Sequence, residues 1–500
     1  MAAFLGLDIG TTSTIGIVID DGERILAKAS RPTTLKTPHP AWAEEDPRQW
    51  WDNVRALVPV LIDKARIGPG DITAIGVTGM VPALVLLDAR GRLIRDSIQQ
   101  SDGRAGAEVA ALAARVDGDA FLRRTGNGVN QQLVATKLNW LERHEPEVFA
   151  AIDTVFGSYD YITWKLTGAR SLERNWGLEA GFVDLATGTI APDLVALGHI
   201  APERLPPLRQ AHEIVGAVTA DAARATGLAA GTPVIAGCAD HVASAYVAGV
   251  VAAGDILIKF GGAGDILAAT HALRPDPRLF TDYHVVPGLY MPNGCMACTG
   301  ALLDWFAANF AGDAGGQATG HRVHRRLDRL AAAIPPGAEG VAALPYFLGE
   351  KTPIHDPYAR GTFTGLSLGH GPAHLWRALL EATAFGFRHH FDVLRDIGHP
   401  IGRVMASDGG TASDLWMRIV ADVLQTPIQI LADHPGSCLG AAWLAGIGQG
   451  SVDDWTGVSR FVGQGRLVEP DPETRYDHGY ALYRDLYAAL KPLFPRMGAT

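Results

Sequence analysis

The feature that most limits how this chain can fold is a strand–turn–strand unit that occurs twice. Near the start, the apolar stretch FLGLD and residues 15–19 flank a turn of sequence Gly-Thr-Thr-Ser. Residues 255–269 repeat this layout, with Gly-Gly-Ala-Gly between DILIKF and DILAA. The two copies agree more in layout than in letters, and they favour an internal duplication in which each copy begins one lobe.

The rest of the chain predicts an α/β fold in two lobes. Short aliphatic strands alternate with amphipathic helices; residues 50–65, for example, have apolar side chains at helical spacing and lead into the apolar stretch 72–77. A long helical region is expected over residues 105–124. Five hundred residues are too many for a single core, and no Pro/Gly/Ser-rich linker separates the halves. We therefore predict two tightly packed lobes, residues 1–250 and 251–500.

The charge balance narrows the possible partners. The chain has 43 Lys and Arg against 53 Asp and Glu, a formal net charge of −10. Nucleic-acid-binding proteins and polybasic membrane binders need a positive surface, so neither class of partner is expected. If the chain binds a phosphate compound, it must do so without a general excess of positive charge.

The chain start and the cysteines are typical of a cytoplasmic enzyme. Asp8 interrupts the first apolar run too early for a signal peptide, and no apolar stretch approaches the ~18 residues of a membrane-spanning helix. Four cysteines in 500 residues do not form a disulfide framework. Cys295 and Cys298 form a CxxC pair without a second pair, which favours reduced thiols over a zinc or redox site.

The first candidate motif surrounds the first turn. Asp8 ends an apolar strand, and the turn after it offers backbone N–H groups and the hydroxyls of Thr11, Thr12 and Ser13. Such a turn can hold phosphate oxygens while the aspartate reaches Mg²⁺ through water. It is neither a GxxxxGK[ST] loop nor a GxGxxG turn followed by a helix. An ordinary hairpin explains the same residues, so both interpretations stay open.

A second aspartate follows another apolar strand, and two glycine pairs occur further along. Asp240 and His241 come after the strand expected at residues 234–237. An aspartate there can be a general base in a cleft at the strand ends, or simply the N-cap of the next helix. The glycine pairs, which let the backbone approach a ligand closely, are Gly261-Gly262 and Gly409-Gly410, the latter followed by Ser413.

Two further stretches could contact a polyol. Asp102 and Arg104 place an acid and a base in one short loop, which is typical either of a sugar contact or of a surface turn. Residues 42–51 (WAEEDPRQWW) combine tryptophans with acids. They suit a sugar site, but a segment that caps the following helix has the same composition.

Taken in order, these motifs resemble the FGGY family of carbohydrate kinases, within the actin-like ATPase superfamily. The most specific match joins GTFTGL at residues 361–366 to HLWRALLE at residues 374–381, and KLNWLERH at residues 137–144 keeps part of a second signature. Residues 345–353 (PYFLGEKTP) resemble the xylulokinase branch in particular. The resemblance implies a two-lobed, ribonuclease H-like fold in which each lobe is a mixed β-sheet flanked by helices, with the ligand cleft between the lobes.

The resemblance also implies a role for individual residues. Asp240 matches the catalytic base, and Asp8 matches the residue that helps to hold Mg²⁺. The positions implied for the sugar are Met80, Val81, Asp102, Arg104, Asp240 and His241. The positions implied for ATP are Thr11, Thr12, Ser13, Gly261, Gly262, Gly409, Gly410 and Ser413.

The implied reaction is ATP-dependent phosphorylation of a primary hydroxyl of a small ketose or polyol. D-xylulose, converted to D-xylulose 5-phosphate, is the first candidate; ribulose and erythritol-like polyols are alternatives. A nucleotide-driven binding module that phosphorylates no small molecule is the alternative from another class, and a homodimer is possible.

The chain departs from the family pattern at three places that bear on the substrate. Pro82 stands where the xylulokinase branch has a sugar-contacting histidine, and His241 stands where asparagine is usual. Gly262 and Ala263 replace hydroxyl-bearing residues in the second phosphate loop. Side chains that would bind sugar hydroxyls have changed, whereas Asp240, the implied catalytic base, is kept. We therefore expect an active kinase with altered sugar specificity.

Overall fold

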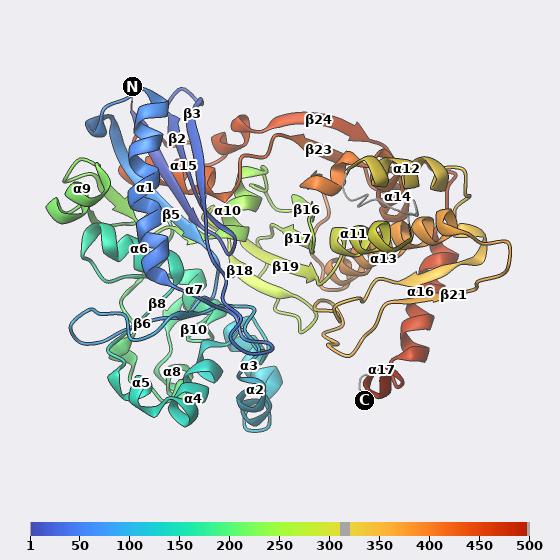
Figure 1. Cartoon of the computed structure of the whole chain (residues 1–500), viewed down its shortest axis with the longest axis horizontal. Helices are drawn as coiled ribbons and strands as arrows, with labels where there is room; N and C mark the ends of the chain where they lie inside the picture. Colours follow the sequence, from blue (N-terminus) through green and yellow to red (C-terminus); the bar gives the residue numbers. More distant parts are fainter. Residues whose placement is uncertain (1, 311–320, 498–500) are drawn as a thin grey trace.

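Two seven-stranded sheets form the centres of two lobes that lie side by side (Figure 1). A computed structural model describes residues 2–310 and 321–497. The strand order of the first sheet is β13-β14-β5-β1-β2-β3, and β15 also pairs with β5. Its strands are β1 (Ala3–Ile9), β2 (Ser13–Asp20), β3 (Ile25–Pro32), β5 (Ile72–Gly79), β13 (Ile214–Ala217), β14 (Pro233–Ile235) and β15 (Cys238–Ala239).

The second sheet is built from the second half of the chain. Its strand order is β18-β19-β17-β16-β22-β23-β24. Its strands are β16 (Ile256–Phe260), β17 (Gly264–Ala268), β18 (Phe280–Tyr283), β19 (Tyr290–Met296), β22 (Val404–Ser407), β23 (Ile428–Ala432) and β24 (Gly463–Val468).

Six strands of each sheet correspond in order and direction, and the strands left over are β15 and β18. In the first, β1 is antiparallel to β2 and parallel to β5, and β5 is parallel to β14. In the second, β16 is antiparallel to β17 and parallel to β22, and β22 is parallel to β23. Each sheet then ends in an antiparallel strand, β13 or β24. This correspondence confirms the duplication that the repeated strand–turn–strand unit predicts.

Helices cover both faces of the first sheet. On one face lie α1 (Pro47–Ala65) and α6 (Ser158–Thr167); on the other lie α10 (Asp240–Val247) and α15 (Ser437–Gln449). Helix α15 comes from the second half of the chain, yet it packs on β1 and β5. The approach is close because Gly6 and Gly76 face it: a Cβ on either would lie 1.8 Å or 2.1 Å from a carbonyl oxygen of α15. The division of the chain at residue 250 stays a prediction.

The remaining α-helices are divided between the two lobes (Figure 1). Those of the second lobe are α11 (Gly300–Phe310), α12 (His321–Ala331), α13 (Pro372–Asp396), α14 (Asp414–Leu424), α16 (Asp477–Leu490) and α17 (Phe494–Met497). Those of the first are α2 (Gly106–Ala113), α3 (Gly118–Thr125), α4 (Val134–His144), α5 (Pro146–Ala151), α7 (Arg174–Glu179), α8 (Pro192–Val195) and α9 (Ala220–Thr226).

Local details correct or confirm three expectations. The helix expected over residues 105–124 is two helices, because Asp117 caps the second of them by accepting from the N–H of Ala120. Residues 42–51 are a capping segment, in which Asp46 caps α1 and Trp50 is buried and donates to Glu45.

All four cysteines are free. Among the described helices, none combines the length and apolar character that crossing a membrane requires.

Candidate active site

Three neighbouring strands of the first sheet end at the same edge and bring two aspartates together. Strands β1 and β15 both run parallel to β5, and Asp8 and Cys238 are both in register with Thr78. Asp240 follows two residues after Cys238. The pKa of Asp8 is raised to about 7, first because the side chain is buried and second because the charge of Asp240 is near.

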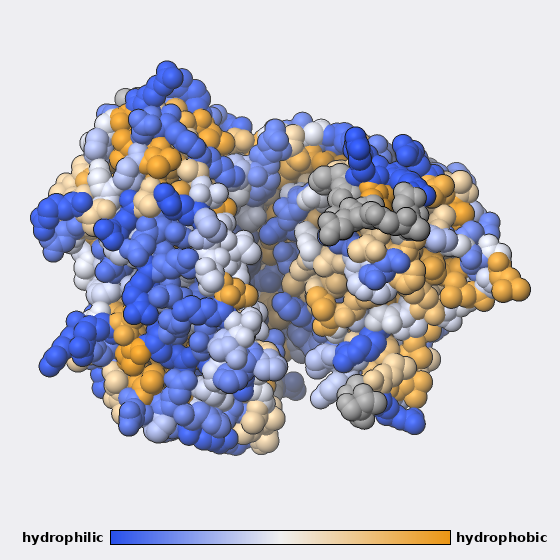
Figure 2. Space-filling model, in the orientation of Figure 1, coloured by the Kyte–Doolittle hydropathy of each residue, from blue (hydrophilic) through white to orange (hydrophobic). Residues whose placement is uncertain are grey.

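A cavity of about 200 Å³ lies at this edge, and residues of both halves line it. We call it the interlobe cavity; Figure 2 shows the recess between the two lobes. The lining residues from the first half include Met80, Val81, Glu179, Asp240 and His241. Those from the second half include Asp265, Asp282, Asn293 and Lys351. Four of the predicted sugar positions therefore lie together: Met80, Val81, Asp240 and His241.

Asp240 is held as an ionised carboxylate. It is the first residue of α10, whose N-cap is Ala239, so its side chain is not needed as a cap. Its Oδ1 accepts a hydrogen bond of 2.6 Å from the backbone N–H of His241. Burial alone would raise the pKa of Asp240, but hydrogen bonding to His241 and the charge of that residue lower it.

His241 is surrounded by acidic groups. Its Nε2 lies 2.9 Å from Oδ2 of Asp282 and 3.9 Å from Oε1 of Glu179, and its Nδ1 lies 3.6 Å from Oδ1 of Asp240. Burial alone would lower the pKa of His241, but the charge of Asp282 and the hydrogen bonds to Asp240 and Asp282 raise it well above its usual value. The ring is therefore an imidazolium that can donate from both nitrogens.

The structure does not bring Asp102 and Arg104 to the interlobe cavity. Both side chains are fully buried, and they pair with each other through Nε and Nη2 of Arg104, both at 2.8 Å. Asp102 also accepts from the N–H of Ala43, and the guanidinium stacks 3.8 Å from the ring centroid of Trp42. Nη1 of Arg104 is buried and has no hydrogen-bond partner among the described residues, whereas the carboxylate of Asp102 is bonded on both oxygens. The pair stabilises the wall of the lobe, and its contact with a sugar stays a prediction.

The first small-residue turn lies beside the cavity. It joins β1 to β2, with a hydrogen bond of 3.1 Å from the N–H of Gly10 to the carbonyl of Ser13. Thr12 is exposed, whereas Thr11 and Ser13 are half-buried. Oγ1 of Thr11 lies 3.7 Å from Sδ of Met80, which itself lines the interlobe cavity.

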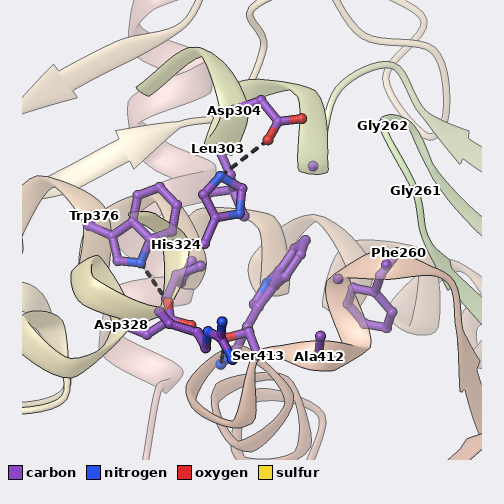
Figure 3. A pocket seen from close by; sticks show the side chains of 16 residues that line it. Phe260, Gly261, Gly262, Leu303, Asp304, His324, Asp328, Trp376, Ala412 and Ser413 are labelled. Atoms are coloured by element: carbon purple, nitrogen blue, oxygen red, sulfur yellow. Dashed lines mark hydrogen bonds and ion pairs between the residues drawn. The ribbon is translucent and has the colours of Figure 1, made fainter. Parts of the chain in front are cut away.

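The second lobe contains a larger cavity of about 640 Å³ (Figure 3). We call it the glycine-lined cavity because the predicted residues Gly261, Gly262, Gly409 and Gly410, together with Ser413, all line it. Ser413 caps α14 by accepting 3.0 Å from the N–H of Trp416. The backbone is packed tightly at one of these glycines: a Cβ on Gly410 would lie 2.5 Å from the Trp416 ring.

Helices form the opposite wall of the glycine-lined cavity. Figure 3 shows that Asp304 and His324 face each other there, with 3.1 Å between Oδ1 and Nε2. It also shows Trp376 donating to Asp328, 2.8 Å from Nε1 to Oδ1. Sequence reasoning assigned none of these residues to a site. Asp304, His324 and Asp328 lie within ordinary amphipathic helices, whereas Trp376 lies in the HLWRALLE stretch that carries the family resemblance.

The hairpin of β16 and β17 separates the two cavities. Gly261 and Gly262, in its turn, line the glycine-lined cavity, whereas Asp265, directly after the turn, lines the interlobe cavity. A group bound by the turn therefore lies next to both cavities.

Sequence reasoning also missed several polar residues of the interlobe cavity. They are Gln100, Gln132, Glu179, Asp265, Asp282, Asn293 and Lys351. Only Lys351 carried a signal, since it lies within the PYFLGEKTP stretch at residues 345–353.

The geometry defines a class of protein: a two-lobed α/β fold of the actin-like ATPase type, with a small polar cavity beside a larger glycine-lined one. Family models for the N-terminal and C-terminal domains of the FGGY family of carbohydrate kinases match residues 3–247 and 262–448. The chain belongs to this family, and it is an ATP-dependent carbohydrate kinase.

Individual relatives match along nearly the whole chain. A xylulose kinase of Escherichia coli is 30% identical over 98% of this chain and 99% of its own length. A xylulose kinase of Bacillus subtilis is 26% identical over 99% of this chain and 98% of its own. The crystal structure of xylulose kinase from Rhodospirillum rubrum is 57% identical, with a TM-score of 0.93, over 98% of this chain and 99% of that one.

Proposed function

We propose that this carbohydrate kinase transfers the γ-phosphoryl group of ATP to a primary hydroxyl of a small uncharged ketose, with D-xylulose as the first candidate and D-xylulose 5-phosphate as the product. The observation that carries the proposal is the ionised carboxylate of Asp240, which lines a small polar cavity formed by both halves of the chain. The similarity to three xylulose kinases supports the choice of sugar.

In the proposed reaction Asp240 is the general base. Its carboxylate accepts the proton of the sugar hydroxyl as that oxygen forms a bond to the γ-phosphorus, and the bond from phosphorus to the β–γ bridging oxygen breaks to release ADP. Hydrogen bonding to His241 fixes the orientation of the carboxylate and keeps it ionised near neutral pH. Asp240 also begins α10 at the strand edge, where α/β proteins commonly bind ligands.

ATP would lie along the glycine-lined cavity, with its terminal phosphate toward the interlobe cavity. Gly409, Gly410 and Ser413 would contact the adenosine part, and the turn at Gly261 and Gly262 would offer backbone N–H groups to the phosphates. The hydroxyls and N–H groups of Thr11, Thr12 and Ser13 would approach the γ-phosphate from the first lobe. The volume of about 640 Å³ is within the usual range for a small-molecule site.

Asp8 has the properties of a magnesium-binding residue. Its side chain is buried, and within the described part of the chain its Oδ1 has no hydrogen-bond partner. A buried, unpartnered carboxylate oxygen beside a phosphate site fits Mg²⁺, which prefers oxygen ligands. When bound, Mg²⁺ would neutralise charge on the phosphate oxygens. The carboxylate of Asp8 would hold it, directly or through water.

The interlobe cavity favours a small uncharged acceptor. Its volume of about 200 Å³ is below the usual range for drug-sized ligands. Three aspartates, Asp240, Asp265 and Asp282, line it against two cationic side chains, His241 and Lys351. Glu179 also lines it, but burial and then the charge of Asp282 raise the pKa of Glu179 well above its usual value. A sugar acid would add a further negative charge to this wall. Carboxylates, an imidazolium and the Asn293 amide together can accept from and donate to several hydroxyls.

The test is a sugar-dependent rate of ADP release, measured against D-xylulose, L-xylulose, D-ribulose, erythritol and D-gluconate. We expect the highest kcat/KM with D-xylulose and the lowest with D-gluconate. If another ketose or polyol has the highest kcat/KM, the choice of sugar is wrong and the kinase assignment stands. A rate no higher than with water alone for every acceptor would contradict the proposed reaction.

Two expectations about the cellular context remain predictions. A cytoplasmic location is expected because ATP is the phosphoryl donor. A homodimer is the second expectation, and the mass of the protein in solution tests it.

A further inference from the structure

Lys259 is a cation that the family-based assignment of site residues does not use. It lies in β16, in register with Asp265 on β17 and with Ser407 on β22, one residue before Phe260 of the glycine-lined cavity. Its strand partner Asp265 lines the interlobe cavity. The side chain therefore comes from the strand that separates the two cavities, and it is 23% exposed.

The ammonium group of Lys259 forms one long ion pair, with Asp265. Its Nζ lies 3.7 Å from Oδ2 of Asp265, longer than the 2.7–2.9 Å or so of a normal ammonium–carboxylate hydrogen bond. Lys28, the other lysine whose charge acts on Asp8, differs: its Nζ donates at 2.6 Å to the carbonyl oxygen of Pro435. An ammonium has three donors, so Lys259 retains donors for a ligand.

The charges around Lys259 belong to the proposed reaction centre. Its positive charge acts on both Asp8 and Asp240. At Asp8 it partly offsets the increase in pKa that burial causes, and at Asp240 it contributes to the lowered pKa. Burial alone would lower the pKa of Lys259, but Asp265, then Asp408 and Asp240, raise it, so the side chain stays charged. It is thus within electrostatic reach of both the proposed base and the proposed magnesium ligand.

The adjoining phosphate turn offers only backbone groups. Its residues Gly261, Gly262, Ala263 and Gly264 have no hydroxyl, and their N–H groups carry only partial charges. In the transition state negative charge is spread over the three equatorial oxygens of the γ-phosphoryl group, and a lysine can bind such oxygens as a point charge. We propose that the ammonium group of Lys259 binds the γ-phosphate of ATP during transfer to the sugar, supplying the contact that the turn lacks. This inference rests on the proposed reaction.

The first test compares kcat and KM in Lys259→Met, Lys259→Arg and Lys351→Met. For Lys259→Met we expect kcat to fall about 100-fold, the usual effect of removing one group that stabilises transition-state charge, with the sugar KM changed less than about threefold. Lys259→Arg should recover part of kcat. Lys351→Met, in the interlobe cavity, should instead raise the sugar KM. A kcat for Lys259→Met within threefold of the original would overturn the proposal.

A second test does not depend on turnover. Isothermal titration calorimetry with ADP and with the β,γ-imido analogue of ATP measures the contribution of the γ-phosphate to binding. We expect Lys259→Met to weaken the analogue about tenfold and ADP hardly at all, with an unchanged melting temperature. Equal weakening of both nucleotides would show a structural role and overturn the inference. If the original chain phosphorylates no sugar, the proposed reaction fails, while this titration still decides whether Lys259 contacts the γ-phosphate.

Discussion

The two cavities of this kinase are built on different principles. The interlobe cavity is small and formed by ionisable and amide side chains from both halves of the chain. The glycine-lined cavity is about three times larger, and all of its lining residues lie between Phe260 and Trp416, where glycine backbone meets aromatic rings. Side-chain chemistry should therefore set the acceptor and the rate, whereas backbone approach should set nucleotide affinity. Each substitution below tests one side of this contrast.

The largest effect is expected in the interlobe cavity, at Asp240. Replacing it by Asn keeps the shape and removes the proton acceptor, so kcat should fall by at least ~100-fold. The KM for ATP should change little, because Asp240 does not line the glycine-lined cavity. Steady-state kinetics with ATP and sugar varied separately measure both values. A nearly normal kcat in a correctly folded variant would remove Asp240 from the role of base.

The glycine-lined cavity offers a matched pair of backbone substitutions. In Gly410→Ala the new Cβ would lie 2.5 Å from the Trp416 ring and 2.7 Å from Cβ of Phe260, so the turn must shift. Overpacking of this kind costs about 1–3 kcal/mol, which predicts a rise in the KM for ATP of about tenfold or more. A Cβ on Gly409 meets no described atom within 4 Å and serves as the control.

The outcome of this pair separates steric from general effects. We expect Gly409→Ala to raise the KM for ATP less than Gly410→Ala, and both to leave the KM for the sugar unchanged. A change in the sugar KM equal to that in the ATP KM would show that the two cavities are not independent.

The sequence predicts the lining of the glycine-lined cavity better than the lining of the interlobe cavity. Gly261-Gly262 and Gly409-Gly410 are continuous in sequence, and all four glycines line one cavity as predicted. Glu179 and Asp282 are isolated acids at the end of α7 and within β18. Packing of α7 inside the first lobe brings Glu179 to His241, and packing of the two lobes brings Asp282 to it. No local pattern carries that information.

The Asp102–Arg104 pair is the opposite case, in which a local pattern predicts a site but the residues do not line the cavity. Asp102 and Arg104 are the residue types of a polyol site, yet both side chains are buried, pair with each other and lie outside the lining of the interlobe cavity. Residue type predicts chemistry only where the side chain also reaches an open cavity. By contrast, the strand–turn–strand repeat predicts both sheets, because each hairpin is local and begins one sheet.

A smaller effect is expected when His241 is replaced, and it concerns the pH dependence of kcat/KM. Hydrogen bonding to His241 and the charge of His241 lower the pKa of Asp240, so His241→Asn should raise that pKa. The base is active when ionised, so the acidic limb of the kcat/KM profile should move to higher pH. Activity near pH 5 should then fall several-fold more than activity near pH 8. An acidic limb at the same pH in both proteins would contradict the coupling.

The smallest effect concerns stability of the wall behind the interlobe cavity. Lys137 is fully buried and donates at 2.7 Å to the carbonyl of Gln99, whose neighbour Gln100 lines the cavity. Burial lowers the pKa of Lys137 to about 7, whereas an unfolded chain has about 10.4. Between these values the unfolded state binds more protons, so the free energy of unfolding should rise with pH, by up to about 1.4 kcal/mol per unit.

Urea unfolding at pH 7.5 and 8.5, with Lys137→Met beside the original chain, isolates this contribution. The original chain should gain stability with pH relative to the variant, in which the titrating group is absent. The comparison also separates the two cavities, because the glycine-lined cavity has no lysine in its lining. The substitution should therefore leave ADP affinity unchanged while it loosens the position of Gln100 and raises the KM for the sugar. Equal pH dependence in both proteins would mean that Lys137 is charged in the folded wall, with its charge stabilised by the nearby carboxylate of Asp102.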